Sequence, residues 1–192
     1  MDTVFLSIKK GGKVIPYPRS ENRDDGSKNH GFKPLRENLN EIDNIPEAQD
    51  IPALKNALIG LNAEESLFFT VGCEKAFIKN GAGHALSGYL EFAFNYSELA
   101  REPQSYFKLF YAFNLWYWKR KQEAARYQFE LEPAHFLKAK TDGFTMSVWI
   151  MIAASSTTES AQKTWESALN TLVEFLVHGT TVMSGGQYTR IY

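Results

Sequence analysis

The chain contains one cysteine, Cys73, among its 192 residues, and this scarcity removes two classes of structure. An internal disulfide needs a second cysteine, and so do the paired-cysteine motifs that bind zinc. The histidines do not compensate, because His30, His84, His135 and His178 are scattered and share no metal-ligand spacing. We therefore expect neither a disulfide nor a metal centre.

The sequence also lacks an excess of positive or negative charge, and it lacks a long run of apolar residues. The 21 basic and 22 acidic residues leave a net charge of −1, which argues against nucleic acid as the partner. The longest apolar run, residues 148–154, is far shorter than the roughly 18 to 20 residues of a membrane span. The N-terminus carries Asp2 where an export signal would be basic, and its apolar stretch ends at Lys9. We expect a cytoplasmic protein without a membrane partner.

The sequence carries no fingerprint of a cofactor or of a known reaction. Gly11-Gly12-Lys13 leads into a β-like segment and not into a helix, so it does not match a phosphate-binding loop. Cys73 is the only thiol nucleophile available, and it falls on the apolar face of a predicted hairpin, where a buried cysteine is inert. These absences favour a protein without catalytic activity and without a cofactor.

One domain spanning residues 1–192 is expected, since no internal repeat or second core pattern is present. Residues 16–50 contain four of the seven prolines, many charges and few large apolar side chains, which predicts an extended, mobile arm. A short helix is expected over residues 52–61, where Pro52 occupies the first helical position.

A β-hairpin between residues 67 and 96 is the clearest local pattern. Apolar side chains fall at odd positions before the glycine-rich stretch 80–83 and at even positions after it. A turn centred on Gly81-Ala82 pairs residues whose numbers sum to 163. This register places the apolar side chains of both strands on one face. The predicted pairs are Phe69 with Phe94, Val71 with Phe92 and Cys73 with Leu90.

A long C-terminal helix is expected over residues 156–178, following strands over residues 127–131 and 144–154. Ser156 and Glu159 have the spacing of a capping box, and Gly179 is a plausible C-terminal cap. Seven apolar residues recur at helical spacing along this segment. They are Ala161, Trp165, Ala168, Leu169, Leu172, Phe175 and Leu176.

Eight of the thirteen residues from 106 to 118 are aromatic, and Lys119-Arg120-Lys121 follows at once. As a helix, the segment would begin near Pro103 and place Tyr106, Phe110 and Phe113 on one stripe. As a strand, its odd positions are uniformly apolar, and aromatic residues are enriched in strands. We favour the strand, with Trp116, Trp118 and Lys108 on its second face.

The expected fold is α+β: a single domain with an antiparallel β-meander of five or six strands packed against the long C-terminal helix. The order of elements resembles the helix-grip arrangement, in which a curved sheet wraps a C-terminal helix. That resemblance implies an apolar ligand held between the sheet and the helix, and it rests on element order alone.

The function favoured by the sequence is binding of another protein, of the inhibitor, immunity or adaptor type, with a cognate toxin or effector as the partner. Aromatic side chains beside arginine are typical of binding hot spots. The expected contact residues are Trp116, Trp118, Tyr106, Arg120, Tyr89 and Glu91.

Two other functions stay open. A small apolar ligand would occupy a cavity between the sheet and the C-terminal helix, lined by Phe92, Phe94, Phe129, Val148 and Ile150. An enzyme would use the carboxylates of Glu74, Glu91 or Glu130, or the imidazole of His135.

Overall fold

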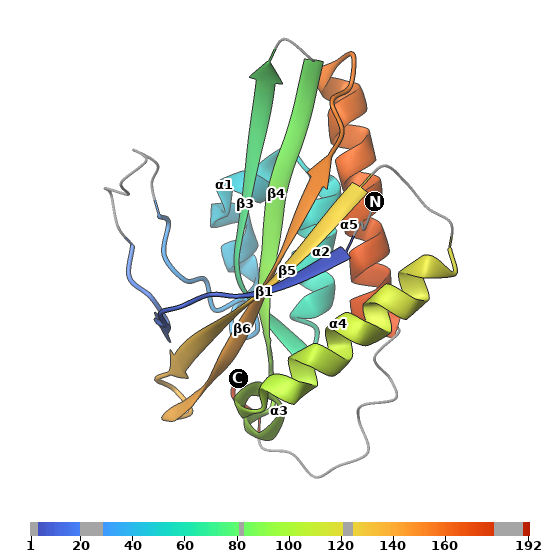
Figure 1. Ribbon diagram of the computed structural model, residues 1–192. Coiled ribbons are helices and arrows are strands. Elements are labelled where there is room, and N and C mark those ends of the chain that lie inside the picture. The colour runs from blue at the N-terminus through green and yellow to red at the C-terminus, as the bar shows by residue number, and fades with distance from the viewer. Residues whose placement is uncertain (1–3, 20–28, 81–82, 121–124, 179–189) are drawn as a thin grey trace.

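The computed structural model describes residues 4–19, 29–80, 83–120, 125–178 and 190–192 (Figure 1). Within these residues, six strands form one sheet that packs against helices. The strands are β1 (Val4–Ile8), β2 (Lys13–Ile15), β3 (Phe68–Asn80), β4 (Gly83–Phe94), β5 (Ala125–Phe136) and β6 (Thr141–Ile152). The helices are the 3-10 helix η1 (Leu39–Asn44), α1 (Pro46–Gln49), α2 (Pro52–Leu61), α3 (Ser97–Arg101), α4 (Pro103–Trp118) and α5 (Thr158–His178).

The sheet has the strand order β1-β5-β6-β4-β3, and β2 also pairs with β5. β1 and β2 run parallel to β5, whereas the other strand pairs are antiparallel. Helix α5 packs on β4, β5 and β6, with α2 beside it. The expected class is therefore confirmed: a single α+β domain with a mostly antiparallel sheet against a long C-terminal helix.

The aromatic segment is a helix, so the preference for a strand at residues 106–118 was wrong. Helix α4 begins with Pro103 in its first turn and buries one stripe of side chains, Tyr106, Leu109, Phe113 and Tyr117. These residues recur every three or four positions, which is the helical period. In a meander, a strand at residues 106–118 would lie next to β4, between β4 and β5. The strand prediction fails because β6 occupies that place in the sheet.

The β3–β4 hairpin is present, and its register changes partway along. Cys73 pairs with Leu90 as predicted, but a bulge between Thr70 and Gly72 shifts the pairing below it. Phe69 consequently pairs with Ala93, and the predicted pairs Phe69–Phe94 and Val71–Phe92 are wrong. The extra residue of a bulge reverses which face each following side chain occupies. Residues 81 and 82, where the turn was placed, lie outside the described residues.

Helix α2 occupies residues 52–61 as predicted, and α5 begins two residues later than expected. The N-terminal cap of α5 is Thr157, whose hydroxyl Oγ1 accepts a hydrogen bond from the backbone N–H of Ser160 at 3.1 Å. The predicted capping pair of Ser156 and Glu159 is therefore replaced by Thr157. The seven stripe residues of α5 are all buried.

Part of the predicted arm packs against the core. Residues 20–28 lie outside the described residues. Of the remainder, Leu35, Ile42, Ile45 and Ala48 are buried, and they come from the segment that carries η1 and α1. This segment lies beside β3 and α2, and it contributes to the lining of a pocket next to β3.

The two faces of the sheet differ. Even residues of β4 and β6 and odd residues of β5 point toward α4 and α5; the Tyr127 hydroxyl of β5 donates a hydrogen bond to the Ala168 carbonyl of α5 at 2.9 Å. The close approach of α5 requires Gly88, because a Cβ there would lie 2.8 Å from Trp165 and 2.6 Å from the Glu74 carbonyl. The opposite face carries a smaller apolar cluster around Phe69 and Phe136, and polar side chains elsewhere.

Candidate functional site

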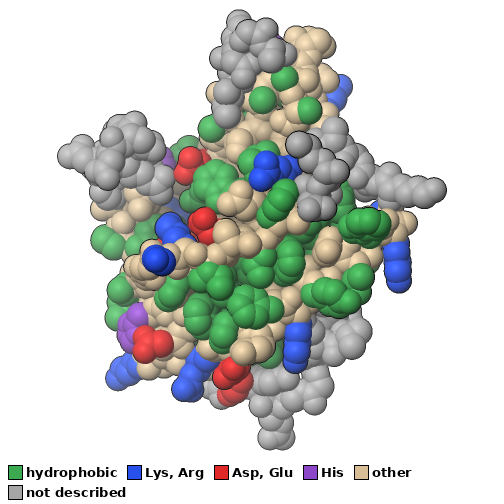
Figure 2. All heavy atoms as spheres, viewed as in Figure 1, with side chains coloured by type: hydrophobic (Ala, Val, Ile, Leu, Met, Phe, Trp, Pro, Cys, Tyr) green, Lys and Arg blue, Asp and Glu red, His purple; other side chains and the backbone are tan. Residues whose placement is uncertain are grey.

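Helix α4 exposes a second apolar stripe on the side turned away from the sheet. Tyr111, Leu115 and Trp118 are spaced i, i+4 and i+7, so they lie on one face of the helix. Their exposed fractions are 62%, 48% and 75%. We call these three side chains the α4 surface. Figure 2 shows apolar side chains gathered over this part of the molecule.

The opposite side of α4 is fixed in the core by aromatic contacts. Phe113 is fully buried, and its ring lies within 5.1 to 6.1 Å of five other rings. These rings belong to Trp116, Tyr117, Tyr127, Phe129 and Phe175. Helix α4 is thus a rigid support on which the α4 surface is displayed.

The C-terminal end of α4 is locked by an arginine. The guanidinium of Arg120 lies 3.9 Å from the ring centroid of Trp116. The same group forms two hydrogen bonds of 2.7 Å with the carboxylate of Glu174 on α5, a bidentate arrangement. These hydrogen bonds hold the pKa of the Glu174 carboxyl below its usual value. Trp116 is partly buried by the contact, whereas Trp118 stays open to solvent.

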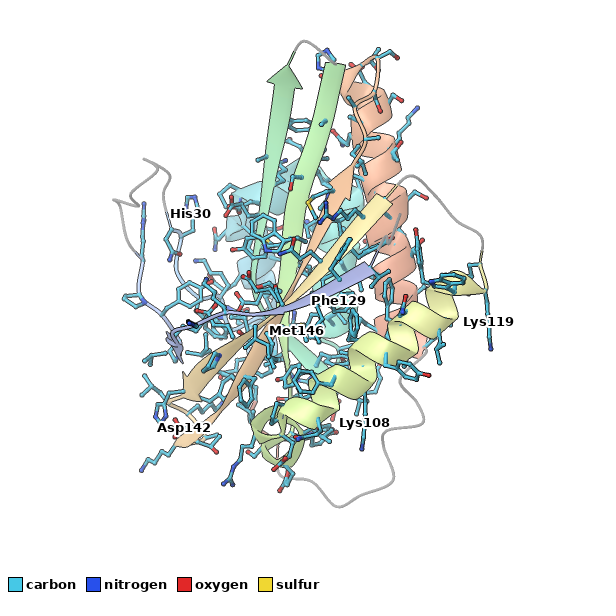
Figure 3. The ribbon with its side chains drawn as sticks, viewed as in Figure 1. His30, Lys108, Lys119, Phe129, Asp142 and Met146 are labelled. Carbon is cyan, nitrogen blue, oxygen red and sulfur yellow. The ribbon has the colours of Figure 1, made fainter. Side chains whose placement is uncertain are left out.

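The charge around the α4 surface is positive. Helix α4 contains no acidic residue, and its only charged side chain is Lys108. Lys119 follows directly after the helix, and both lysines are exposed. Figure 3 shows Lys108 on α4 and Lys119 at the C-terminal end of the helix, both projecting away from Phe129 in the sheet. The apolar stripe therefore has a basic margin.

Tyr106 is not available as a contact residue, which corrects its assignment. It is fully buried, its ring packs against Phe94 and Phe144, and its hydroxyl donates a hydrogen bond to the Phe144 carbonyl. Burial raises the pKa of this hydroxyl. Because α4 is a helix, Tyr106 lies on the same buried face as Phe113, about two turns away.

Tyr89 and Glu91 are far from α4 in the fold, since they lie on the face of the sheet opposite the helices. Tyr89 packs against Trp149 with ring centroids 4.6 Å apart. Glu91 is only 3% exposed, and its Oε1 accepts a hydrogen bond of 2.7 Å from the Lys13 ammonium. The expectation of Glu91 as an accessible contact is therefore wrong, and the six proposed residues do not form one surface.

Lys13 is the centre of a buried ionic cluster that the sequence did not indicate. Its ammonium Nζ lies 2.7 Å from Glu91 Oε1 and 2.8 Å from Glu132 Oε2, and Lys9 lies 3.4 Å from Glu132. Burial lowers the pKa of Lys13, but the two carboxylates outweigh it and raise the pKa above its ordinary value of 10.5. The salt bridges of this cluster connect β2 with β4 and β5.

The residues considered for catalysis are not brought into one cleft. Glu91 is engaged by Lys13, while His135 Nδ1 lies 2.7 Å from the Asp142 carboxylate on the neighbouring strand. In the described part of the chain, no group of three or more histidine, cysteine, aspartate or glutamate side chains is arranged to hold a metal ion. No helix among those residues has the length and apolar character needed to cross a membrane.

The residues expected to line an apolar cavity are instead packed. Phe92, Phe94, Phe129, Val148 and Ile150 are each fully buried. The indole of Trp165 fills the space between sheet and helix and donates a hydrogen bond to the Ile150 carbonyl at 3.1 Å. A pocket of about 420 Å³ does exist, but it lies beside the edge strand β3.

The thiol of Cys73 is expected to be unreactive. Burial raises its pKa to about 12, and the nearby Glu47 and Glu74 carboxylates add to the shift. At pH 8 the thiolate fraction is then roughly a thousandfold lower than for an ordinary cysteine. Alkylation by iodoacetamide, followed by mass spectrometry, should be slower by about that factor than in the urea-unfolded chain. Equal rates in the two states would contradict the burial of this thiol.

Comparisons with family models, curated proteins and solved structures yield no match to this chain. The candidate site therefore rests on geometry alone. Sequence reasoning identified Trp118 but missed Tyr111 and Leu115. Their i, i+4, i+7 spacing was present in the sequence, but it becomes meaningful only once the segment is assigned as a helix.

Proposed function

We propose that this protein binds another protein through the α4 surface and has no catalytic role, as an inhibitor, immunity protein or adaptor would. The main observation in support is that α4 carries large apolar side chains on two sides, while the fold buries only one of these stripes. A surface helix normally turns one apolar stripe to the core and polar side chains to solvent. Tyr111, Leu115 and Trp118 are left without cover among the described residues. A partner would provide that cover.

The chemistry of the α4 surface supports a protein partner. Tryptophan and tyrosine dominate binding hot spots, because they bury a large area at a low cost in side-chain entropy. Trp116 and Arg120 are already held in place by Glu174, which lowers the entropy lost on association. The basic margin of Lys108 and Lys119 favours a partner with acidic residues around an apolar patch. We place this interaction in the cytoplasm, where the single unpaired Cys73 fits a reducing environment.

Replacement of Trp118 by alanine should weaken partner capture about thirtyfold or more and leave the fold intact, since hot-spot truncations cost about 2 kcal/mol or more. Wild type and variant would be immobilised at equal density, exposed to lysate of the native cell, and compared by quantitative mass spectrometry. Proteins recovered by wild type and lost with Trp118→Ala are the candidates. Their dissociation constants are then measured with purified partner.

The matched control is Lys163→Ala, an exposed position on α5 away from the α4 surface. It should capture the same proteins as the wild type. Circular dichroism should be unchanged for both variants. If Trp118→Ala unfolds the chain, or if it captures the same set of proteins as the wild type, the α4 surface is not the binding site.

A further inference from the structure

Strand β3 forms one edge of the sheet, and one half of that edge is sealed by side chains. The Arg36 guanidinium donates a hydrogen bond to the Phe68 carbonyl at 2.8 Å. The Asn62 side-chain oxygen accepts one from the Thr70 N–H at 3.2 Å, and the Tyr17 hydroxyl donates one to the Val71 carbonyl at 2.8 Å. Phe68, Thr70 and Val71 therefore each have an outward backbone group that is hydrogen-bonded within the molecule.

Beyond the bulge the same edge is open. The Asn95 N–H donates to the Leu67 carbonyl, so the odd residues of β4 turn their backbone groups toward β3. The register pairs these odd residues with Gly72, Glu74 and Ala76. The backbone groups of Cys73, Lys75 and Phe77 consequently point outward, and no described residue donates to them or accepts from them. An unpaired run of this kind is a template for another strand.

The pocket of about 420 Å³ lies along this open stretch. It is lined by β3 from residue 70 to residue 76, and chain segments rise on both sides of the strand. Its lining includes the apolar side chains Leu35, Ile45 and Leu58, the tyrosines Tyr17 and Tyr89, and the charged residues Lys33, Glu47, Glu74 and Lys75. The pocket therefore lies directly against the stretch of β3 whose outward backbone groups are unpaired among the described residues.

Lys75 carries a charge that the fold matches only through a long salt bridge. Its side chain is only 17% exposed, and its ammonium forms a salt bridge of 3.8 Å with the carboxylate of Asp50. That distance exceeds a hydrogen bond, and Asp50 is itself 87% exposed. An incoming carboxylate at hydrogen-bond distance would pair with this ammonium more closely than the exposed Asp50 does.

We propose that β3 binds an extended segment of another protein as an added strand across Cys73, Lys75 and Phe77. An acidic residue of that segment pairs with Lys75. The residue two positions away, on the same side of the added strand, places an apolar side chain against Ile45 and Leu58. Backbone hydrogen bonds supply affinity, and these two side chains supply specificity. The site is separate from the α4 surface and does not depend on it.

A second copy of the chain fits this edge less well. An antiparallel pairing of β3 with β3 over residues 73–77 is centred on Lys75, which brings two ammonium groups into one groove. Like charges at directly opposed positions destabilise a strand pair.

A phage library of 12-residue peptides, panned on the full chain, tests the proposal. Enriched peptides should share an acidic and an apolar residue separated by one position. The strongest is synthesised with a fluorophore, and its anisotropy is measured with the protein. N-methylation of single backbone amides should weaken binding at least tenfold at every second residue and by less than twofold between them.

Charge reversal then assigns the pairing. Lys75→Glu should weaken binding of the selected peptide about tenfold, and replacing the acidic residue of the peptide by lysine should restore it. Lys75→Gln provides a second variant should Lys75→Glu fold poorly, and Lys163→Glu on α5 is the charge-matched control that binds as wild type. The proposal is overturned if enrichment is equal on Lys75→Glu, or if N-methylation shows no two-residue period. It is also overturned if ultracentrifugation shows a wild-type dimer that Lys75→Glu dissociates.

Discussion

Replacing Lys13 by methionine should destabilise the protein by about 3 kcal/mol or more at pH 8, the cost typical of breaking a buried ion pair. The change removes the cation between Glu91 and Glu132, which are 3% and 7% exposed. Two carboxylates then remain buried side by side without Lys13. Lys9, at 3.4 Å from Glu132 and half exposed, replaces little of the lost attraction.

The loss caused by Lys13→Met should shrink as the pH falls. Without the cation, burial and mutual repulsion raise the pKa of the two carboxyls above their unfolded values. Groups with a raised folded pKa contribute stability that is present at low pH and lost as the pH rises through the folded pKa. The variant should therefore approach wild type from pH 8 to pH 5. In the wild type, the contribution of Lys13 is lost as the pH rises past 10.5 and through the raised pKa of its ammonium.

Urea denaturation at pH 5, 6.5 and 8 measures this effect. The informative control is the triple variant Lys13→Met, Glu91→Gln, Glu132→Gln, which carries no buried charge at the site and should lose the pH dependence. Lys9→Met should change stability by less than about 1 kcal/mol. A loss for Lys13→Met that is constant across this pH range would show that the two carboxylates are hydrated and not buried.

Replacing Phe113 by alanine should cost about 4 kcal/mol, because its ring is fully buried and contacts five other aromatic rings. The truncation leaves a cavity between α4, β5 and α5 that rigid neighbouring rings cannot fill. The midpoint of urea unfolding, followed by tryptophan fluorescence and by circular dichroism, gives the change.

Tyr111→Ala is the matched control on the same helix. Its side chain is 62% exposed on the outer face, so its removal should change stability by less than about 1 kcal/mol. The difference in free energy of unfolding between the two variants compares how much the inner and outer sides of α4 contribute to stability. Equal losses would mean that the outer face is structural, and the proposal of a binding surface there would lose its basis.

Elements whose apolar residues follow a single repeat, helical or alternating, could be predicted from the sequence. The stripe of α5 from Ala161 to Leu176 follows the helical repeat without interruption, and all its members are buried. Cys73 pairs with Leu90 because alternation around a glycine turn fixes a register. The register fails below Gly72, since a bulge adds one residue without leaving a distinct mark in the apolar pattern.

Features that depend on contacts between distant segments could not be predicted from the sequence. The segment of residues 106–118 satisfies both a strand and a helix pattern, and the pairing of β4 with β6 decides between them. The ionic cluster joins Lys13 to Glu91 across 78 positions of the chain, and no spacing rule connects residues so far apart. Accordingly, Trp118 was recognised as a contact candidate from its type, whereas the burial of Tyr106 and Glu91 required the fold.

The pairing of β1 with β5 bears on how the chain is made. Val4 pairs with Tyr127, and Lys9 reaches Glu132, 123 positions later in the sequence. Because a ribosome adds residues from the N-terminus onward, β1 leaves the ribosome well before β5, the strand with which it pairs. During that interval Val4, Phe5, Leu6 and Ile8 are an unpaired β-forming segment. Completion of the sheet at this edge is therefore a late event in biosynthesis, and a chain released early lacks it.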